Sequence, residues 1–370
     1  MARGTEKHAY AGGNTGDGFH SFYDQIAPAD ARRVIILKGG PGVGKSTLMR
    51  QVGQHMQDQG YSVEYFHCSA DINSLDGVRI PALEVTIMDG TAPHIVDPKY
   101  PGAVDEIIHL GDFWLEAGIH NHKQQIMATS AAISRQYARA YRFLAAAKIV
   151  KQDTRALNRE GFHVGRVNET AASLIQSIFG HRPVSTDVGR VRRLFASAIT
   201  ANGLLNHLDN LMTPLKHKYI LLGSPGTGKS AVIDKVIGAA VERGFAVEAF
   251  HCALEPSRVE HVIIPALNVA VISADEWHMY AASDAISINF DQFRHVEAVK
   301  KNARNLAENA QLINDLLNRA IACLAEAKTL HDQLEEYYVP NMDFTGVETL
   351  RAQLIERILS YAPMTSVPAQ

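Results

Sequence analysis

Apolar residues form two short runs, at 34–37 and 219–222, and each run is followed directly by a glycine-rich segment. Continuous aliphatic runs of this length are typical of buried strands. After each glycine-rich segment, apolar residues recur at a spacing of four, which predicts an amphipathic helix. These residues are Leu48, Val52 and Met56 in the first case, and Val232, Val236 and Ala240 in the second.

The chain is a tandem duplication. The sequence GYSVEYFHC at 60–68 aligns with GFAVEAFHC at 244–252, and IPAL at 80–83 aligns with IPAL at 264–267, both at an offset of 184. Further along, RA, LA and AK pairs at 139–148 align with those at 319–328 at an offset of 180. We therefore predict two domains of one kind, 1–182 and 183–370, joined near Pro183.

Each half alternates predicted strands and helices, which indicates an α/β fold with a mostly parallel sheet covered by helices on both faces. The expected strands are 33–38, 62–68 and 83–88 in the first half, and 218–222, 246–252 and 267–272 in the second. The expected helices are 45–59 and 229–243. Beyond the third strand each half carries a long helical extension, with apolar residues from Ile126 to Ala147 and from Leu306 to Leu334. Packing between helices is the simple interpretation of these stripes, and a lid over a bound ligand is the alternative.

The glycine-rich segments read GGPGVGKST and GSPGTGKSA, and both match G-x-x-x-x-G-K-[ST], the phosphate-binding loop. Backbone N–H groups of such a loop and of the following helix bind phosphate oxygens, the lysine reaches the β- and γ-phosphates, and the hydroxyl ligates Mg²⁺. We predict ATP and Mg²⁺ as cofactors, with Ser46 and Ser230 as metal ligands. The predicted nucleotide-binding residues are Gly39, Gly40, Pro41, Gly42, Val43, Gly44, Lys45, Ser46 and Thr47, and Gly223, Ser224, Pro225, Gly226, Thr227, Gly228, Lys229, Ser230 and Ala231.

Asp89 ends the apolar run 85–88, in the manner of a Walker B strand, where a carboxylate holds Mg²⁺. A simple Asp-Gly turn is the alternative. The aligned residue in the second half is Ser273, with Asp275 two positions on. We therefore expect the second site to bind nucleotide but to hydrolyse it poorly, unless Asp275 compensates.

Asp71 and Glu255 align three residues after the His-Cys pairs. A carboxylate at the carboxyl edge of a sheet can orient water or accept a proton, so both are candidate catalytic residues together with Lys45, Lys229 and Asp89. A solvated loop acid is an equal alternative. Phosphoryl transfer also commonly uses an arginine, for which Arg139 and Arg319 are candidates. Ordinary exposed arginines of a helix are the favoured alternative.

Two histidine pairs are retained between the halves, His67 with His251 and His94 with His278. A zinc site would need four ligands, which the single cysteine beside each of the first two does not provide. We expect His67 to be packed at a strand end, with a hydrogen bond to a neighbouring loop. His94 could face phosphates or a second substrate.

Composition adds limits. A net charge of −3 gives no electrostatic case for nucleic acid binding, and no stretch of the 370 residues is apolar enough to suggest a membrane span. Three cysteines and no signal-like N-terminus fit a cytoplasmic location. The sequence leaves any protein partner unknown, and the two halves could pair within the chain.

Taken together, these motifs resemble P-loop NTPases, and their tandem arrangement is similar to a bacterial family of duplicated P-loop ATPase-like proteins. The resemblance rests on residues 10–15, 39–46, 89–94, 100–107 and 111–114. It implies ATP binding and no particular substrate. In the second half the segments matching 89–94 and 100–107 have diverged, which argues against equal activity of the two sites.

Three functions follow as hypotheses. The first is an Mg²⁺-dependent ATP hydrolase in which the first site is the more active. The second is a small-molecule kinase with Asp71 as base, because Asp89-Gly90 followed by proline resembles the strand end of nucleoside monophosphate kinases, with His94 in place of arginine. The third is a nucleotide-gated binding module, in which ATP changes the shape of the protein.

Overall fold

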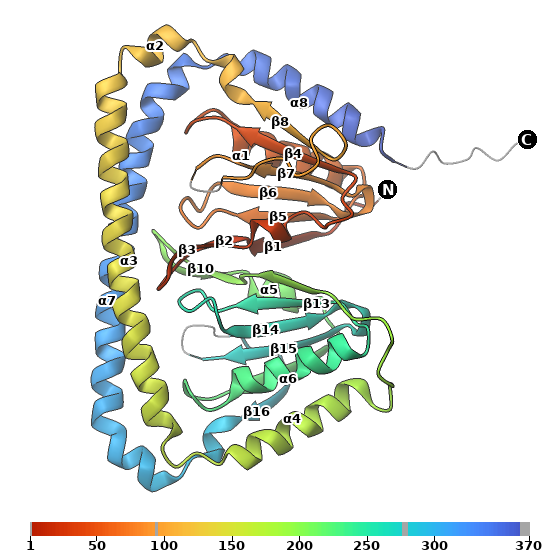
Figure 1. Ribbon diagram of the computed structural model, residues 1–370, viewed down its shortest axis with the longest axis vertical. Coiled ribbons are helices and arrows are strands. Elements are labelled where there is room, and N and C mark those ends of the chain that lie inside the picture. The colour runs from red at the N-terminus through yellow and green to blue at the C-terminus, as the bar shows by residue number, and fades with distance from the viewer. Residues whose placement is uncertain (1, 93–94, 276–279, 363–370) are drawn as a thin grey trace, which may run out of the picture. The chain divides into compact units, whose positions relative to one another are not determined.

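The computed structural model describes residues 2–92, 95–275 and 280–362. The chain folds into two compact units (Figure 1). Unit 1 consists of Met1–Ala11, Tyr23–Ser134 and Ala327–Gln370, and unit 2 of Gly12–Phe22 and Arg135–Glu326. Each unit therefore contains chain from both sequence repeats, and the units do not coincide with the repeats 1–182 and 183–370.

Unit 1 is built on a six-stranded sheet with only one strand antiparallel to its neighbours, β6. The expected strands at 33–38, 62–68 and 83–88 are present as β4, β5 and β7, with small shifts at their ends. Strands β1, β6 and β8 were not expected. The order across the sheet is β1 (Glu6–Tyr10), β5 (Val63–His67), β6 (Leu75–Ile80), β7 (Val85–Asp89), β4 (Arg33–Lys38) and β8 (Asp105–His109).

Unit 2 repeats this sheet with the same pattern of parallel and antiparallel pairs. The order is β16 (Ile286–Asn289), β12 (His217–Leu222), β15 (Val269–Ala274), β14 (Val259–Ile264), β13 (Val247–His251) and β9 (Val191–Leu194). Two small hairpins complete the strands, β2 (Gly12–Thr15) with β3 (Gly18–Ser21) and β10 (Ser197–Thr200) with β11 (Gly203–Asn206). The chain is thus a duplicated α/β protein.

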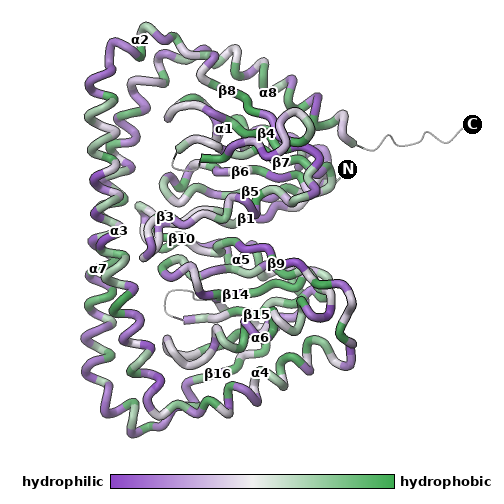
Figure 2. The backbone as a smooth tube through the Cα atoms, viewed as in Figure 1, coloured by the Kyte–Doolittle hydropathy of each residue, from purple (hydrophilic) through white to green (hydrophobic). Residues whose placement is uncertain are grey.

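The helices fall into two groups, one next to the sheets and one in the extensions. Those next to the sheets are α1 (Lys45–Asp58), α5 (Leu208–Met212) and α6 (Lys229–Glu242). The extensions are α2 (Glu116–His120), α3 (Lys123–Arg159), α4 (Val164–Phe179), α7 (Val296–Tyr338) and α8 (Phe344–Leu359). Figure 2 shows α3 and α7 as mainly hydrophilic with isolated apolar turns, whereas the central strands are largely hydrophobic. Among the helices described, none has the length and apolar character needed to cross a membrane.

The extensions are exchanged between the repeats. In unit 1, α8 from the second repeat covers α1 from the first, where Val347, Leu354 and Ile358 join one core with Leu48 and Val52. In unit 2, α4 from the first repeat covers α6 from the second in the same way. The apolar stripes of α3 and α7 pack together in unit 2 through Ala140, Leu144, Ala147, Ala320, Cys323 and Leu324.

Candidate functional site

The two glycine-rich loops, 39–47 and 223–231, connect the end of a parallel strand to the start of a helix. Helices α1 and α6 begin at Lys45 and Lys229, and their N-caps Gly44 and Gly228 have φ of 88° and 89°. Neither N-cap is covered by a side-chain hydrogen bond. The glycine caps supply no side-chain acceptor to the first N–H groups of either helix, and the helix dipole favours an anion at this position.

The lysine of each loop folds back onto its own backbone carbonyls. Lys45 Nζ donates to Gly39 O at 2.9 Å and to Gly40 O at 2.8 Å. Lys229 Nζ donates to Gly223 O and, at 3.4 Å, to Ser224 O. Burial lowers the pKa of Lys229, while Asp275 and Asp291 act in the opposite direction. Both ammonium groups thus lie inside the loops, where an incoming anion would meet them.

Asp89 lies beside the first loop, as predicted. Strand β7 pairs in parallel with β4, so that Asp89 stands opposite Leu37, and its Oδ2 is 3.6 Å from Lys45 Nζ. Its Oδ1 accepts from Thr91 N at 2.8 Å. The register position in the second repeat is Ser273, opposite Leu221.

The helix-start hydroxyls have different partners in the two repeats. Ser46 Oγ accepts from Leu75 N at 2.9 Å, whereas Ser230 Oγ accepts from the Arg258 guanidinium at 2.9 Å. For Mg²⁺, which prefers oxygen ligands, Ser46 with Asp89 is a suitable donor pair. Ser230 instead faces a cation, so the matching position in the second repeat fits the metal poorly.

Asp71 and Glu255 lie in the loops after β5 and β13, at the predicted edge of each sheet. Both contact a helix of the other repeat. Asp71 is 3.7 Å from Lys328 Nζ and accepts from Ser74 Oγ, whereas Glu255 pairs with Arg155 at 2.6 Å. These carboxylates therefore anchor helices, and their use as catalytic bases stays a prediction.

Helix residues that sequence reasoning did not single out lie against the loops. A Cβ placed on Gly42 would be 3.4 Å from Glu335 Cβ, and one placed on Gly226 would be 2.9 Å from Arg155 Cα. Glu335 and Arg155 are related by the same offset of 180 that joins the helical repeats, so the sequence did carry the signal.

The arginines proposed from sequence lie elsewhere. The Arg319 guanidinium sits 5.9 Å from the centre of the Phe143 ring, and Arg139 bonds Gln136 one turn away. Both arginine side chains are exposed on the long helices.

The sequence predictions also missed a second pair of acids retained in both repeats, Asp76 and Glu260. The two are 184 positions apart, which is the offset that aligns the repeats, so the sequence alone could have revealed them. Asp76 is buried, and burial raises its pKa to about 7, with Asp89 adding to the effect and a hydrogen bond from Tyr23 opposing it. Glu260 lines the cavity of the second loop. Each acid is on the antiparallel strand next to the strand that carries Asp89 or Ser273.

The retained histidines are packed at strand ends. His67 Nε2 is 2.8 Å from His8 Nδ1, a residue of the neighbouring strand β1, and His251 Nδ1 is 2.6 Å from Pro256 O in the adjoining loop. Cys68 and Cys252 are buried beside them. His94 and His278 lie outside the described residues.

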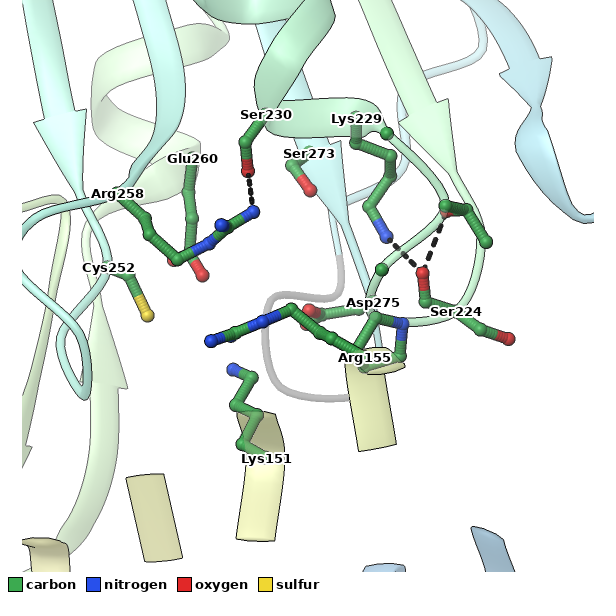
Figure 3. A pocket seen from close by; sticks show the side chains of 14 residues that line it. Lys151, Arg155, Ser224, Lys229, Ser230, Cys252, Arg258, Glu260, Ser273 and Asp275 are labelled. Carbon is green, nitrogen blue, oxygen red and sulfur yellow. Dashed lines mark hydrogen bonds between the residues drawn. The ribbon is translucent and has the colours of Figure 1, made fainter. Parts of the chain in front are cut away.

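A cavity opens in front of the second loop (Figure 3). Lys151 and Arg155 reach into it from α3, and Arg258 and Lys229 point into it from the sheet side and the loop. Its volume is about 40 Å³, room for very few water molecules. A triphosphate would therefore displace side chains, Lys229 among them, from their present positions.

The comparisons with known proteins give one local similarity. A family profile described as the nephrocystin 3 N-terminal region matches residues 19–79, a stretch that includes β4, the first loop, α1 and β5. The searches of curated proteins and of solved structures each found no match. The chain is therefore similar to that region over a minor part of its length.

Proposed function

We propose that this protein binds ATP at both glycine-rich loops and hydrolyses it with Mg²⁺, chiefly at the first loop. The observation that carries the proposal is the 3.6 Å pair between Lys45 and Asp89, formed where a parallel strand ends next to the loop. The N-termini of α1 and α6, whose glycine caps supply no side-chain acceptor, support nucleotide binding at both loops.

In this proposal each residue of the first site has a distinct task. Backbone N–H groups of residues 39–46 bind the phosphates, and Lys45 leaves its loop carbonyls to contact the terminal phosphates. Ser46 and Asp89 hold the metal, which when bound neutralises phosphate charge. The Lys45–Asp89 contact holds the two side chains next to each other before the ligand arrives.

The test compares Lys45→Ala with Lys229→Ala in the full chain. We expect Lys45→Ala to lower phosphate release by at least about a hundredfold, the scale of lost transition-state stabilisation at such sites, and Lys229→Ala to lower it much less. Asp89→Asn should abolish release while ATP still binds. Equal losses in the two lysine variants would contradict the assignment of hydrolysis to the first loop.

A nucleotide-gated binding module is the second candidate, and one observation favours it. Because Glu335 and Arg155 pack directly on the two loops, a loop that opens for nucleotide has to move α7 or α3. This candidate predicts that ATP changes the hydrogen exchange of these helices even in the Asp89→Asn variant, which does not hydrolyse it. Unchanged exchange on ATP binding would exclude it. Phosphate transfer to a small molecule, with Asp71 as base, stays a prediction.

A further inference from the structure

The two loop sites differ sharply in charge. Four cations and two carboxylates line the second cavity, namely Lys151, Arg155, Lys229, Arg258, Glu260 and Asp275. At the offsets of 180 and 184, the first site has in their places His331, Glu335, Lys45, Ser74, Asp76 and Thr91. A seventh position adds Asp89 to the first site and Ser273 to the second. The first site thus has one lysine and three carboxylates.

The structure supports this matching. Arg155 and Glu335 pack against the corresponding glycines Gly226 and Gly42. The ion pairs next to the two sites do not reverse the difference in charge between them. Glu255 offsets one cation of the second site, whereas Asp71 and Lys328 offset each other at the first. The second site therefore stays the more positive.

Lys151 is well placed to act on an anion. It is buried on α3, 6 % exposed, and Figure 3 shows its ammonium directed into the cavity next to the Arg155 side chain. Burial opposes its charge, whereas neighbouring groups, among them the carboxylates of Glu260 and Asp275, act in the opposite direction, and its pKa lies above the ordinary value. Guanidinium and ammonium groups grouped this closely bind phosphate oxygens strongly.

We propose that the second site binds the polyphosphate group directly through Lys151, Arg155, Lys229 and Arg258 without a divalent cation, whereas the first site requires Mg²⁺. At the first site the carboxylates of Asp89 and Glu335 repel bare phosphate, and a bound metal ion would offset that repulsion. At the second, side-chain cations supply that neutralisation, and Ser230 is engaged by Arg258. This inference deepens the proposed function and rests on it for the identity of the ligand as ATP.

The test measures the affinity of the full chain for labelled ATP by equilibrium dialysis, in excess MgCl₂ or in excess EDTA. Lys45→Ala leaves the second site to bind, and Lys229→Ala leaves the first. We expect the affinity of the Lys45→Ala protein to change less than about threefold between the two conditions, and that of the Lys229→Ala protein to fall at least about tenfold in EDTA. Loss of ATP from the Lys45→Ala protein in EDTA would overturn the inference.

Inorganic tripolyphosphate in EDTA separates this inference from the nucleotide assignment. Lys151→Met should weaken its binding by at least about tenfold, the scale for a lost charged hydrogen bond. Lys151→Arg should largely restore it, which excludes a simple folding defect. Lys300→Met, which removes one exposed lysine of α7, is the matched control and should bind as the natural chain does.

The second measurement distinguishes failure of this inference from failure of the proposed function. If tripolyphosphate binds in EDTA and depends on Lys151 while ATP does not bind at all, the proposed function fails and the anion site stands. If ATP binds but tripolyphosphate needs Mg²⁺, or binds equally well to Lys151→Met, the inference fails and the proposed function stands.

Discussion

Replacing Gly226 by alanine tests whether α3 is seated on the second loop. Gly226 has φ of +92°, which costs an L-residue about 1–2 kcal/mol. The new Cβ would also lie 2.7 Å from Arg155 O and 2.9 Å from Arg155 Cα. These are backbone atoms of a helix, so the clash cannot be relieved by a rotamer change.

The expected loss follows from adding the two effects. Overpacking against a fixed neighbour costs about 1–3 kcal/mol, which with the backbone strain gives about 2–5 kcal/mol for Gly226→Ala. At Gly42 (φ +68°) the nearest atom is a methyl group of Val339, 2.8 Å away, which can shift. Gly42→Ala should therefore cost less.

The measurement is urea unfolding followed by circular dichroism, with hydrogen exchange of α6 peptides to locate the loss in unit 2. Gly238→Ala is the control, because this glycine is inside α6 and no atom of the neighbouring structure lies within 4 Å of its Cβ position. It should stabilise the protein by about 1 kcal/mol. If Gly226→Ala changes stability by less than about 0.5 kcal/mol while Gly238→Ala behaves as expected, α3 does not pack on the loop as described.

Three further outcomes are expected. Because the pKa of Asp76 is raised, the folded protein keeps a proton that the unfolded chain releases near pH 4, so the free energy of unfolding should fall as the pH rises from 4 to 7. Asp76→Asn should remove up to about 4 kcal/mol of that fall, which urea unfolding at a series of pH values would measure. Unchanged pH dependence in the variant would contradict a neutral buried carboxyl. Ile358 is a fully buried residue of α8, which packs against α1, so Ile358→Ala should lower the free energy of unfolding by about 2–5 kcal/mol and increase hydrogen exchange in α1. An increase in hydrogen exchange confined to α8 would count against that packing. Cys68, Cys252 and Cys323 are buried, so Ellman's reagent should react with them at pH 8 only after urea is added, and rapid labelling of the native protein would show that these sites open.

The elements next to the loops could be predicted from sequence because local signals there agree. An aliphatic run, a glycine motif and a helical period gave β4, α1 and their counterparts nearly to the residue. Strand β6 was missed, because Asp76 and Gly77 interrupt its apolar pattern. Its extended form is set by pairing with β5 and β7, which are contacts that no local pattern displays.

The part of the candidate site that lies inside the sequence motifs could be predicted, and the part that the long helices contribute could not. Residues inside the motifs, such as Lys45 and Asp89, lie where expected. Lys151 and Arg155 were missed because a helical stripe shows which face is apolar but not which partner it covers. Arg139 and Arg319 were chosen for their retention between the repeats, but both are exposed side chains of the long helices. A charged position that changes sign between repeats, such as Arg155 against Glu335, was the more informative signal.

The exchange of α4 and α8 has a consequence for biosynthesis. During translation the sheet strands and α1 of unit 1 emerge long before α8, the segment that closes their core, leaves the ribosome. Unit 2 requires no segment beyond Glu326, so it is the first that can close. We expect the first glycine-rich loop to reach its final packing last, and nascent chains to need shielding of the α1 surface until then.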